Sequence, residues 1–477
     1  MNVKMALPKG HLLGGTVGLL ERAAWGLTDY YEGMRVYRLS SGRFPHLFAK
    51  VFHEEDIPVQ VAIGNYDLGI TSLDWIEELL TKYPDSALVK VKDLGYGDGA
   101  LYAATSREVG ITSLGDLSQR HDTVRIASEY PNLAEHLAAS LRLRRFRIYP
   151  LWGAPEAYPP EHAELVLLSG KSEEEILQSG LLPLGKIIEG RAVLIANRNS
   201  WETGDMGEMI ASICDHLAPD AGEKEMKPAS PPVFAAGRSW GKVPDHVVRL
   251  ALPDGHQQVH VRRILDAAGV KISDYPGEAW HRRPVSSLEG VMIKVIRPQD
   301  MLVQVANGNF DLAITGRDWL FDHLYQFPGS PVKELLDLKY GRVRLVAVVH
   351  NDLPVADIDG LRQDYRGRQQ KIRVASEYVN IADRYARDNR LGMYRIIPTW
   401  GATEAFLPED ADLLIENTET GKTIARNNLK IIDTLFESTA CLIGNTGEIT
   451  NPVKREKIDT IVAMLVRAME AISRDDH

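Results

Sequence analysis

Cysteine is almost absent from this sequence, since only Cys214 and Cys441 occur in 477 residues. The chain also has neither a Cys-x-x-Cys motif nor a His-Glu-x-x-His motif. Two isolated cysteines cannot form a disulfide framework, and the ligand spacing of a standard zinc site is missing. We therefore expect a protein of a reducing compartment, the cytoplasm, that is held together by neither disulfides nor a structural zinc ion.

Long apolar runs and an excess of positive charge are missing as well. No apolar stretch approaches the roughly 20 residues that span a bilayer, and the opening MNVKMALPKG lacks the basic-then-apolar run of a signal peptide. The formal net charge of −10 argues against nucleic acid as a main partner. A polyanionic substrate would need locally concentrated donors and a divalent cation to bind.

The most informative feature that is present is an internal repeat. Four segments of the first half return in the second half at offsets between 244 and 248 residues: ALPKGH (6–11) as ALPDGH (251–256), VQVAIGNYDLGITSLDW (59–75) as VQVANGNFDLAITGRDW (303–319), ASEYPN (127–132) as ASEYVN (375–380), and WGAPEA (152–157) as WGATEA (400–405). Such ordered recurrence predicts a tandem duplication of one domain arrangement.

The repeat sets the domain organisation. Residues 219–246 are rich in Pro, Gly, Ser and charge without periodicity, which predicts a linker between a first copy, 1–218, and a second copy, 247–477. Within each copy, short apolar runs alternate with helix-length amphipathic segments. This alternation predicts α/β sheets that are largely parallel, with ligands at the carboxyl ends of the strands.

One strand-to-loop segment, ADLLIENTETGKTIARNN (411–428), has the composition of a phosphate-binding loop. It is not a nucleotide-triphosphatase P-loop, because Glu416 stands where that motif needs glycine. The amides of 418–423 would instead lie at a helix N-terminus, with Gly421 allowing close approach to an anion. The alternative is an ordinary strand-to-helix turn capped by threonine.

Taken together, these motifs resemble the ATP phosphoribosyltransferase family in its short form. The resemblance is ordered along both copies: ALPKGH, DIPVQVAIGNYDLGIT, RIASEYPNLA, the WGAxEA segment, ADLLIENTETGKTIARNNLKIID and ACLIGN. It implies two tandem copies of a two-lobed fold like that of type II periplasmic binding proteins, with mixed, mostly parallel sheets. The first lobes would be 1–99 with 190–218 and 247–342 with 437–477, and the second lobes 100–189 and 343–436.

The resemblance also implies a reaction, in which N1 of ATP joins C1′ of 5-phosphoribosyl pyrophosphate and pyrophosphate leaves, the first step of histidine biosynthesis. Mg²⁺ would be carried by the substrate, without protein ligands of its own. Arg297 and Lys9 are the catalytic candidates. The donor would bind at Glu404, Glu416, Thr418, Glu419, Thr420, Gly421, Lys422 and Thr423, and ATP at Ser376, Glu377, Tyr378, Trp400, Gly401 and His256.

The two copies are unequally equipped for this chemistry. Against ENTETGKT (416–423) the first copy has LSGKSEEE (168–175), so that glutamates replace Gly421 and Thr423. A single negative charge about 5 Å from a phosphate charge costs roughly 3 kcal/mol at an effective dielectric constant of 20. We therefore expect donor binding in the second copy alone.

The second copy departs from the family pattern too. Asp254 stands where the first copy has Lys9, and the family's arginine after the glycine is His11 in one copy and His256 in the other; Arg297 is matched by His53. One interpretation is an intrachain pseudo-dimer in which the first copy lends Lys9, and the alternative is that Lys9 is a surface residue left from the duplication.

Two other functions stay open at this point. The chain would be a non-catalytic nucleotide-binding or regulatory paralogue if the departures abolish turnover, or a transferase with a different acceptor base. The resemblance also leaves open a homo-oligomer and a synthetase-like regulatory subunit as partners. Small-molecule substrates, with no nucleic acid and no membrane, are the partners that we expect.

Overall fold

The computed structural model describes residues 3–34, 36–204, 206–217, 243–255, 257–276, 282–366, 370–447 and 451–475. Most of the expected linker and the candidate His256 lie outside these residues. Within them the chain forms four mixed sheets, two in each copy. No helix in this part of the chain is both long and apolar enough to cross a bilayer.

The first lobe of the first copy is built on one sheet of order β2-β3-β1-β4-β11-β5. Its strands are nearly continuously apolar and buried, as in β1 and β4, because helices cover the sheet. The bounds are β1 (Val3–Lys9), β2 (Arg38–Leu39), β3 (Leu47–His53), β4 (Leu68–Ser72), β5 (Leu88–Asp93), β11 (Ala192–Asn197), α1 (Leu13–Arg22), α2 (Asp56–Ala62), α3 (Leu73–Lys82), α7 (Arg198–Thr203) and α8 (Gly207–Cys214).

The second lobe of the first copy has the sheet order β10-β6-β9-β7-β8. Its elements are β6 (Ala100–Thr105), β7 (Val124–Ser128), β8 (Phe146–Pro150), β9 (Leu165–Gly170), β10 (Leu182–Glu189), α4 (Leu114–Ser118), α5 (Pro131–Ser140), α6 (Glu173–Gln178), and the short 3₁₀ turns η1 (Arg107–Val109) and η2 (Pro155–Ala157). The chain leaves the first lobe after β5 and returns to it through β11, so two crossings join the lobes.

The second copy repeats this plan with the orders β13-β12-β14-β21-β15 and β18-β17-β19-β16-β20. Its first lobe holds β12 (Val248–Pro253), β13 (Val291–Ile296), β14 (Leu312–Gly316), β15 (Val332–Asp337), β21 (Ala440–Asn445), α9 (Gln257–Ala267), α10 (Pro298–Ala306), α11 (Arg317–Gln326) and α15 (Pro452–Asp475). Its second lobe holds β16 (Val343–His350), β17 (Ile372–Ser376), β18 (Tyr394–Pro398), β19 (Leu413–Thr418), β20 (Leu429–Ser438), α12 (Ile358–Tyr365), α13 (Val379–Asp388), α14 (Lys422–Arg426) and η3 (Thr403–Phe406).

The sheets are mixed, but they are not mostly parallel. Antiparallel pairs are as common as parallel ones, because the strands that carry the chain between lobes, such as β10 and β20, pair antiparallel with their neighbours. β20 also continues to Ser438, slightly beyond the boundary expected at Glu437. The apolar runs of the sequence show that a strand is buried, but they do not show the direction in which it runs.

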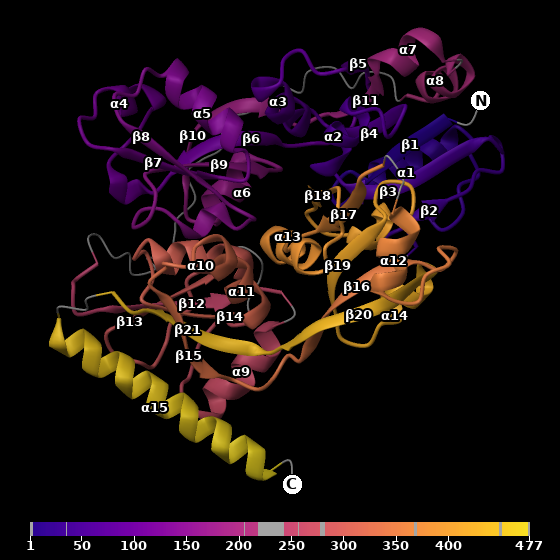
Figure 1. Cartoon of the computed structure of the whole chain (residues 1–477). Coiled ribbons are helices and arrows are strands. Elements are labelled where there is room, and N and C mark those ends of the chain that lie inside the picture. The colour runs from indigo at the N-terminus through magenta and orange to yellow at the C-terminus, as the bar shows by residue number, and fades with distance from the viewer. Residues whose placement is uncertain are drawn as a thin grey trace.

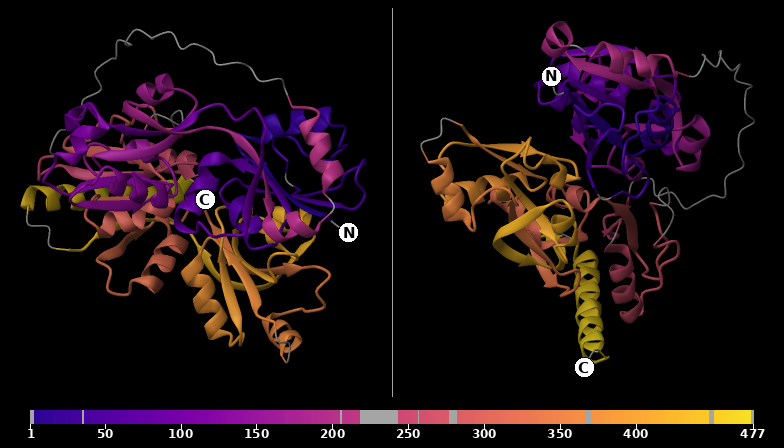
Figure 2. Two further views of the ribbon diagram at one scale, coloured as in Figure 1. Left: turned by 90° about the horizontal axis from the view of Figure 1, so that it is seen from above. Right: turned by 90° about the vertical axis from the view of Figure 1, so that its right-hand side faces the viewer.

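The two copies pack crosswise. In Figure 1 the strands β1 and β3 of the first copy lie beside β17 and β19 of the second, while β6 to β9 lie over β12 and β14. Figure 2 shows the same stacking of the first copy on the second from two more sides. Ring contacts between the copies agree with the views: the ring centroids of Phe52 and Phe406 lie 5.3 Å apart, and those of His162 and Phe310 lie 4.7 Å apart. Each first lobe therefore faces the second lobe of the other copy.

Candidate functional site

The crosswise packing creates two equivalent sites, each with a loop from one copy and strand ends from the other. Site 1 contains the first copy's loop 168–175 and its WGAxEA segment, and this segment contacts Arg297 at the end of β13. Site 2 contains the second copy's loop 416–423 and the ends of β1 and β3. The two sites adjoin, because Trp152 and Trp400, at equivalent positions of the repeat, lie with ring centroids 6.2 Å apart.

In site 2 the backbone of the second copy lies close to a side chain of the first. Gly401 has φ +116°, and a Cβ atom placed there would lie 2.9 Å from His53 Nε2 and 3.5 Å from Glu377 Oε1. Only glycine fits this position, both for its backbone angle and for the space available. Gly401 therefore lets the β3 end of one copy approach the WGAxEA segment of the other.

The loop 416–423 is preorganised by its own side chains. The backbone N–H of Gly421 donates to Thr418 Oγ1 at 2.9 Å, and Gly421 has φ +71° with nothing within 4 Å of an added Cβ. Glu419, Thr420 and Lys422 are exposed around it. One expected amide donor, that of Gly421, is thus already engaged, and α14 has only five residues. The loop's remaining amides and hydroxyls, rather than a long helix dipole, are what an anion would meet.

Three carboxyl groups of the second copy meet beneath this loop, those of Glu377, Glu404 and Glu416. Burial is the main cause that raises the pKa of all three, to about 7 for Glu377, and their mutual repulsion adds to the shift for Glu377 and Glu416. Glu416 also accepts from the backbone N–H of Asn417 at 2.9 Å. Among the described residues no group of three acidic, histidine or cysteine side chains is arranged to hold a metal ion. The cluster is better suited to accepting hydrogen bonds from hydroxyl groups.

Lys9 of the first copy faces this cluster. Burial lowers the pKa of Lys9, and the negative charge of Glu404 partly offsets the shift. The ammonium group donates to Tyr37 Oη at 3.4 Å. Beside it, burial and then the charge of Lys9 lower the pKa of His53 to about 4, so that its imidazole is neutral at pH 7. The structure thus brings Lys9 together with the donor candidates of the other copy.

Two of the ATP candidates do not offer a free side chain. Ser376 and Tyr378 are fully buried; Ser376 Oγ donates to the Ile415 carbonyl at 2.7 Å, and Tyr378 Oη donates to Asp318 Oδ2 at 2.8 Å. Asp318 belongs to the first lobe of the same copy, so this bond ties the two lobes together. The sequence motif ASEY therefore positions the strand end, and of its side chains Glu377 is the one that faces the carboxyl cluster.

Site 1 is filled by its own ion pairs. Arg282 donates to Glu156 Oε1 at 2.6 Å and to Asp254 Oδ2 at 3.0 Å, and Arg297 lies 3.3 Å from the same Asp254 oxygen. The positions of Asp254 and Arg297 correspond to Lys9 and His53 in site 2. A charge reversal at one position is thus balanced by arginines at its neighbours.

The loop of site 1 is closed as well. The carboxylate of Glu175, which stands where site 2 has Thr423, accepts the backbone N–H of Lys171. This internal anion occupies an amide that a phosphate would otherwise use. Burial, and then the negative charges of Glu173, Glu174 and Glu175, raise the pKa of nearby Tyr102. Loop 168–175 carries its own negative charge where loop 416–423 leaves room for a ligand.

Arg297, expected to be a catalytic residue together with Lys9, does not lie beside it. A Cβ at Gly153 would lie 2.6 Å from Arg297 Nε, so the side chain lies in site 1. The physical reason is the crosswise packing, which sends β13 of the second copy to the second lobe of the first. The two catalytic candidates, Lys9 and Arg297, therefore belong to different sites.

Some residues of these sites were missed in the sequence. Arg282 was not singled out, although the replacement of Lys9 by Asp254 is a signal that a matching cation is needed nearby. His53 was noticed only as the counterpart of Arg297, yet it lies against Gly401. Both residues act across the interface between copies, which no local motif describes.

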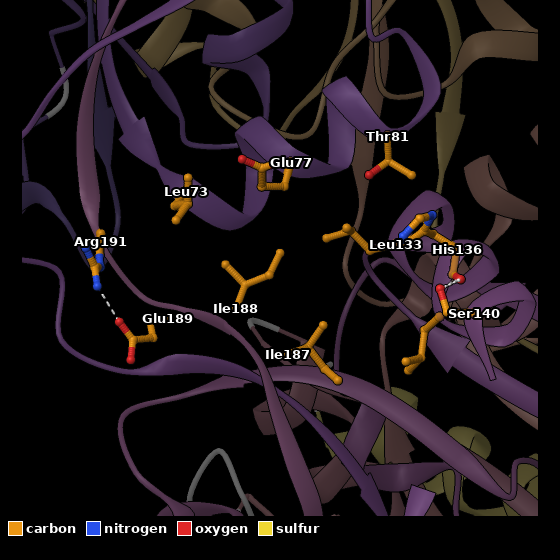
Figure 3. Close-up of a pocket in the computed structure, with 11 residues that line it drawn as sticks. Leu73, Glu77, Thr81, Leu133, His136, Ser140, Ile187, Ile188, Glu189 and Arg191 are labelled. Atoms are coloured by element: carbon orange, nitrogen blue, oxygen red, sulfur yellow. Dashed lines mark hydrogen bonds and ion pairs between the residues drawn. The ribbon is translucent and has the colours of Figure 1, made fainter. Parts of the chain in front are cut away.

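A hollow lies elsewhere, in the first copy between α3, α5 and β10. It has a volume of about 490 Å³ and is lined by Leu73, Glu77, Thr81, Leu133, His136, Leu137, Ser140, Ile187, Ile188, Glu189 and Arg191 (Figure 3). At the equivalent place in the second copy, Phe321 packs edge-on against Phe436, and the Arg384 guanidinium covers the Tyr325 ring. The hollow therefore lies where the second copy has aromatic side chains that the first copy lacks.

Fold and sites together define a class of protein, an α/β chain of two tandem copies with two lobes in each copy. The sequence pattern of the family described as ATP phosphoribosyltransferase matches residues 53–218 and 297–467. The chain belongs to this family, whose members are pentosyltransferases.

Individual relatives agree with this assignment. An ATP phosphoribosyltransferase of Chlorobium phaeovibrioides is 33% identical over 233 residues, covering 48% of this chain and 73% of the relative. One from Thermodesulfovibrio yellowstonii is 30% identical over 234 residues, covering 48% and 74%. Among solved structures, the ATP phosphoribosyl transferase (HisG:HisZ) complex from Thermotoga maritima is 23% identical with a TM-score of 0.37, over 47% of this chain and all of that chain. Each relative matches about half of this chain, as expected for a tandem duplication.

Proposed function

We propose that the chain joins N1 of ATP to C1′ of 5-phosphoribosyl pyrophosphate with release of pyrophosphate, the first step of histidine biosynthesis, and that it does so in site 2 alone. The observation that supports this most is the pairing of a loop that has glycine at position 421 and threonine at position 423 with Lys9 from the other copy. Site 1 has neither feature, because its loop carries Glu173 and its strand end carries Asp254.

The donor would bind with its 5-phosphate in loop 416–423 and its ribose toward the carboxyl cluster. Thr420, Thr423 and the free loop amides supply hydrogen-bond donors, and Gly421 allows close approach of the backbone. Glu416 and Glu404 would accept from the two ribose hydroxyls, which suits carboxyl groups that lie close together. Mg²⁺ would enter with the pyrophosphate as part of the substrate.

ATP would approach from the first lobe of the first copy and the Trp400 side. The indole of Trp400 is 43% exposed despite its contact with Trp152, so one face remains available for stacking. Gly401 and Glu377 border the same space. His256, the remaining ATP candidate, lies outside the described residues.

The proposed reaction requires stabilisation of charge rather than a strong base. N1 of adenine is already nucleophilic; a C1′–N1 bond forms as the C1′–O bond to pyrophosphate breaks, and the electron pair leaves with the pyrophosphate. Lys9 would stabilise the departing negative charge, and the carboxylates would offset the cationic character that develops at C1′. His53, neutral at pH 7, can donate or accept a hydrogen bond without adding charge.

The rival function, a non-catalytic or regulatory paralogue, drew support from Asp254 and His256. The structure assigns Asp254 to site 1, where it pairs with Arg282 and Arg297, so its charge does not bear on site 2. A transferase with another acceptor base remains the second possibility for site 2. We also propose the cytoplasm as the location and keep a synthetase-like regulatory subunit as a partner prediction.

An absorbance assay of the adduct with ATP, phosphoribosyl pyrophosphate and Mg²⁺ tests the proposal. We expect turnover with ATP, its loss on removal of Mg²⁺, and no product when ATP is replaced by GTP. Pyrophosphatase should pull the reaction forward by removing a product. Donor binding without turnover would favour the paralogue, and turnover with another purine alone would identify a different acceptor.

A further inference from the structure

Each first lobe inserts one fully buried lysine into the second lobe of the other copy. Lys50 on β3 and Lys294 on β13 occupy equivalent positions, and both have 0% of their side chains exposed. Lys50 Nζ donates to Glu409 Oε2 at 2.7 Å, and Lys294 Nζ donates to the equivalent Glu161 Oε2 at 2.7 Å. This lysine–glutamate pair is the same at both interfaces, so it does not favour the unlike copy over the like copy.

Beside each lysine the two interfaces differ at a matched pair of positions. At one interface Tyr66 Oη donates to Asp410 Oδ2 at 2.9 Å, and Lys50 Nζ lies 3.0 Å from the same oxygen. At the other, Phe310 takes the place of Tyr66, His162 takes the place of Asp410, and their rings pack with centroids 4.7 Å apart. A hydroxyl faces a carboxylate at one interface, and a plain ring faces an imidazole at the other.

The imidazole of His162 is suited to its own partner. Burial lowers the pKa of His162 well below its ordinary value, and the positive charges of Lys294 and nearby arginines add to the shift. A neutral imidazole packs against the Phe310 ring without the penalty of a buried charge. His162 therefore meets Phe310 by ring packing, whereas Asp410 meets Tyr66 through a hydrogen bond.

The opposite combinations would be poorer. Asp410 against Phe310 would lose its hydroxyl donor and leave a buried carboxylate with less compensation. An imidazole in place of the Asp410 carboxylate would be larger and would remove the anionic partner of buried Lys50, whose Nζ lies 3.0 Å from Asp410 Oδ2. Either mismatch arises when a first lobe meets the second lobe of an identical copy.

We infer that these four residues form a pairing code that directs each first lobe to the second lobe of the other copy. Tyr66 with Asp410 is one matched pair, and Phe310 with His162 is the other. The partner that fits this surface is the unlike copy of the duplication, and the like copy of a second chain is disfavoured. The code acts on assembly and does not depend on which reaction site 2 performs.

The test exchanges these residues between the two interfaces of the full chain. The half exchange, D410H with H162D, creates a mismatch at both interfaces, whereas the full exchange adds Y66F and F310Y and restores matched pairs in reversed positions. We expect the half exchange to lower the thermal unfolding midpoint by roughly 5 °C or more and to promote concentration-dependent self-association in sedimentation, because matched pairs would then lie on like copies.

The full exchange is the control for side-chain changes as such, since it contains the same two substitutions. We expect it to recover most of the lost midpoint and to sediment as the wild-type chain does. If the half exchange is insoluble, recovery of soluble protein by the full exchange carries the same information. Equal midpoints for the two variants, whether both unchanged or both lowered, would overturn the pairing code.

Discussion

Sites 1 and 2 descend from one sequence and share one backbone plan, yet they handle charge in opposite ways. Site 2 leaves Lys9 facing a cluster of carboxyl groups, so its charges are only partly compensated within the protein. Site 1 pairs Asp254 with Arg282 and Arg297 and satisfies its loop with Glu175. A duplicated site can therefore lose the ability to bind its ligand when the protein's own side chains supply the charges that the ligand would bring.

The largest expected effect comes from moving a site 1 residue into site 2. Gly421→Glu should lower turnover roughly a thousandfold, because the added carboxylate repels the donor phosphate and a side chain enters the αL position. Steady-state kinetics with circular dichroism would measure both rate and folding. Gly421→Asn, which tolerates αL, is the matched control and should lose far less activity. A folded Gly421→Glu protein with normal turnover would contradict the assignment of site 2.

Replacement of Lys9, which the first copy contributes to site 2, should have the next largest effect. Lys9→Met keeps the stem of the side chain but removes the charge that faces Glu404, so kcat/KM should fall roughly a hundredfold. At the equivalent position of site 1, Asp254→Asn should leave the rate unchanged and lower stability by about 2 kcal/mol, because Arg282 loses a charged partner. Parallel kinetics and urea unfolding would show the contrast, and a reversed pattern would mean that site 1 is the working site.

Donor stoichiometry sharpens the comparison without any mutation. Titration calorimetry with phosphoribosyl pyrophosphate and Mg²⁺ should give one site per chain. Loop 168–175 ends in three glutamates, whereas loop 416–423 has Gly, Lys and Thr at the equivalent positions. Glu173→Gly removes one of these charges but leaves Glu175, so the stoichiometry should stay at one. Two equivalent sites per chain in the wild-type protein would show that the internal anions of site 1 are displaced by the donor.

The smallest effect concerns pH. The pKa of Glu377 is raised to about 7 in the folded protein, and it returns to an ordinary value near 4.5 on unfolding. The folded state therefore binds more protons between these values, so its stability falls as pH rises from about 4.5 through 7, by up to ~1.4 kcal/mol per pH unit for one such group.

Glu377→Gln tests this dependence in urea unfolding at several pH values. The variant should show a shallower loss of stability between pH 5 and 7 than the wild-type chain. Glu129 in site 1 has a pKa raised to about 7 by burial as well, so Glu129→Gln should flatten the curve similarly. Identical slopes in all three proteins would show that these carboxyl groups do not titrate in this range.

Much of the fold was predictable because it depends on repetition and local pattern. The duplicated segments predicted two copies, and the run ending at Glu416 predicted a buried strand, which is β19. Strand direction was less accessible, since antiparallel strands such as β16 are as continuously apolar as parallel ones. The alternation of hydrophobic and polar residues does not record which way a neighbouring strand runs.

The candidate site was likewise predictable only where its residues are close together in the sequence. Loop 416–423 is one continuous segment, so its residues could be named together from the sequence. Arg297 was placed in the wrong site, and Arg282 was missed, because their surroundings come from a different copy more than 100 residues away. Contacts at that distance depend on how whole lobes pack, which short motifs do not encode.

The crosswise packing has a mechanical consequence. Salt bridges such as Lys50 with Glu409 and Lys294 with Glu161 join unlike lobes into two blocks, and two crossings in each copy connect those blocks. We therefore expect a motion that opens the cleft of one copy to rotate one block against the other and to open the second cleft with it. A substitution that stiffens the crossing strands of the first copy should then slow ligand entry at site 2.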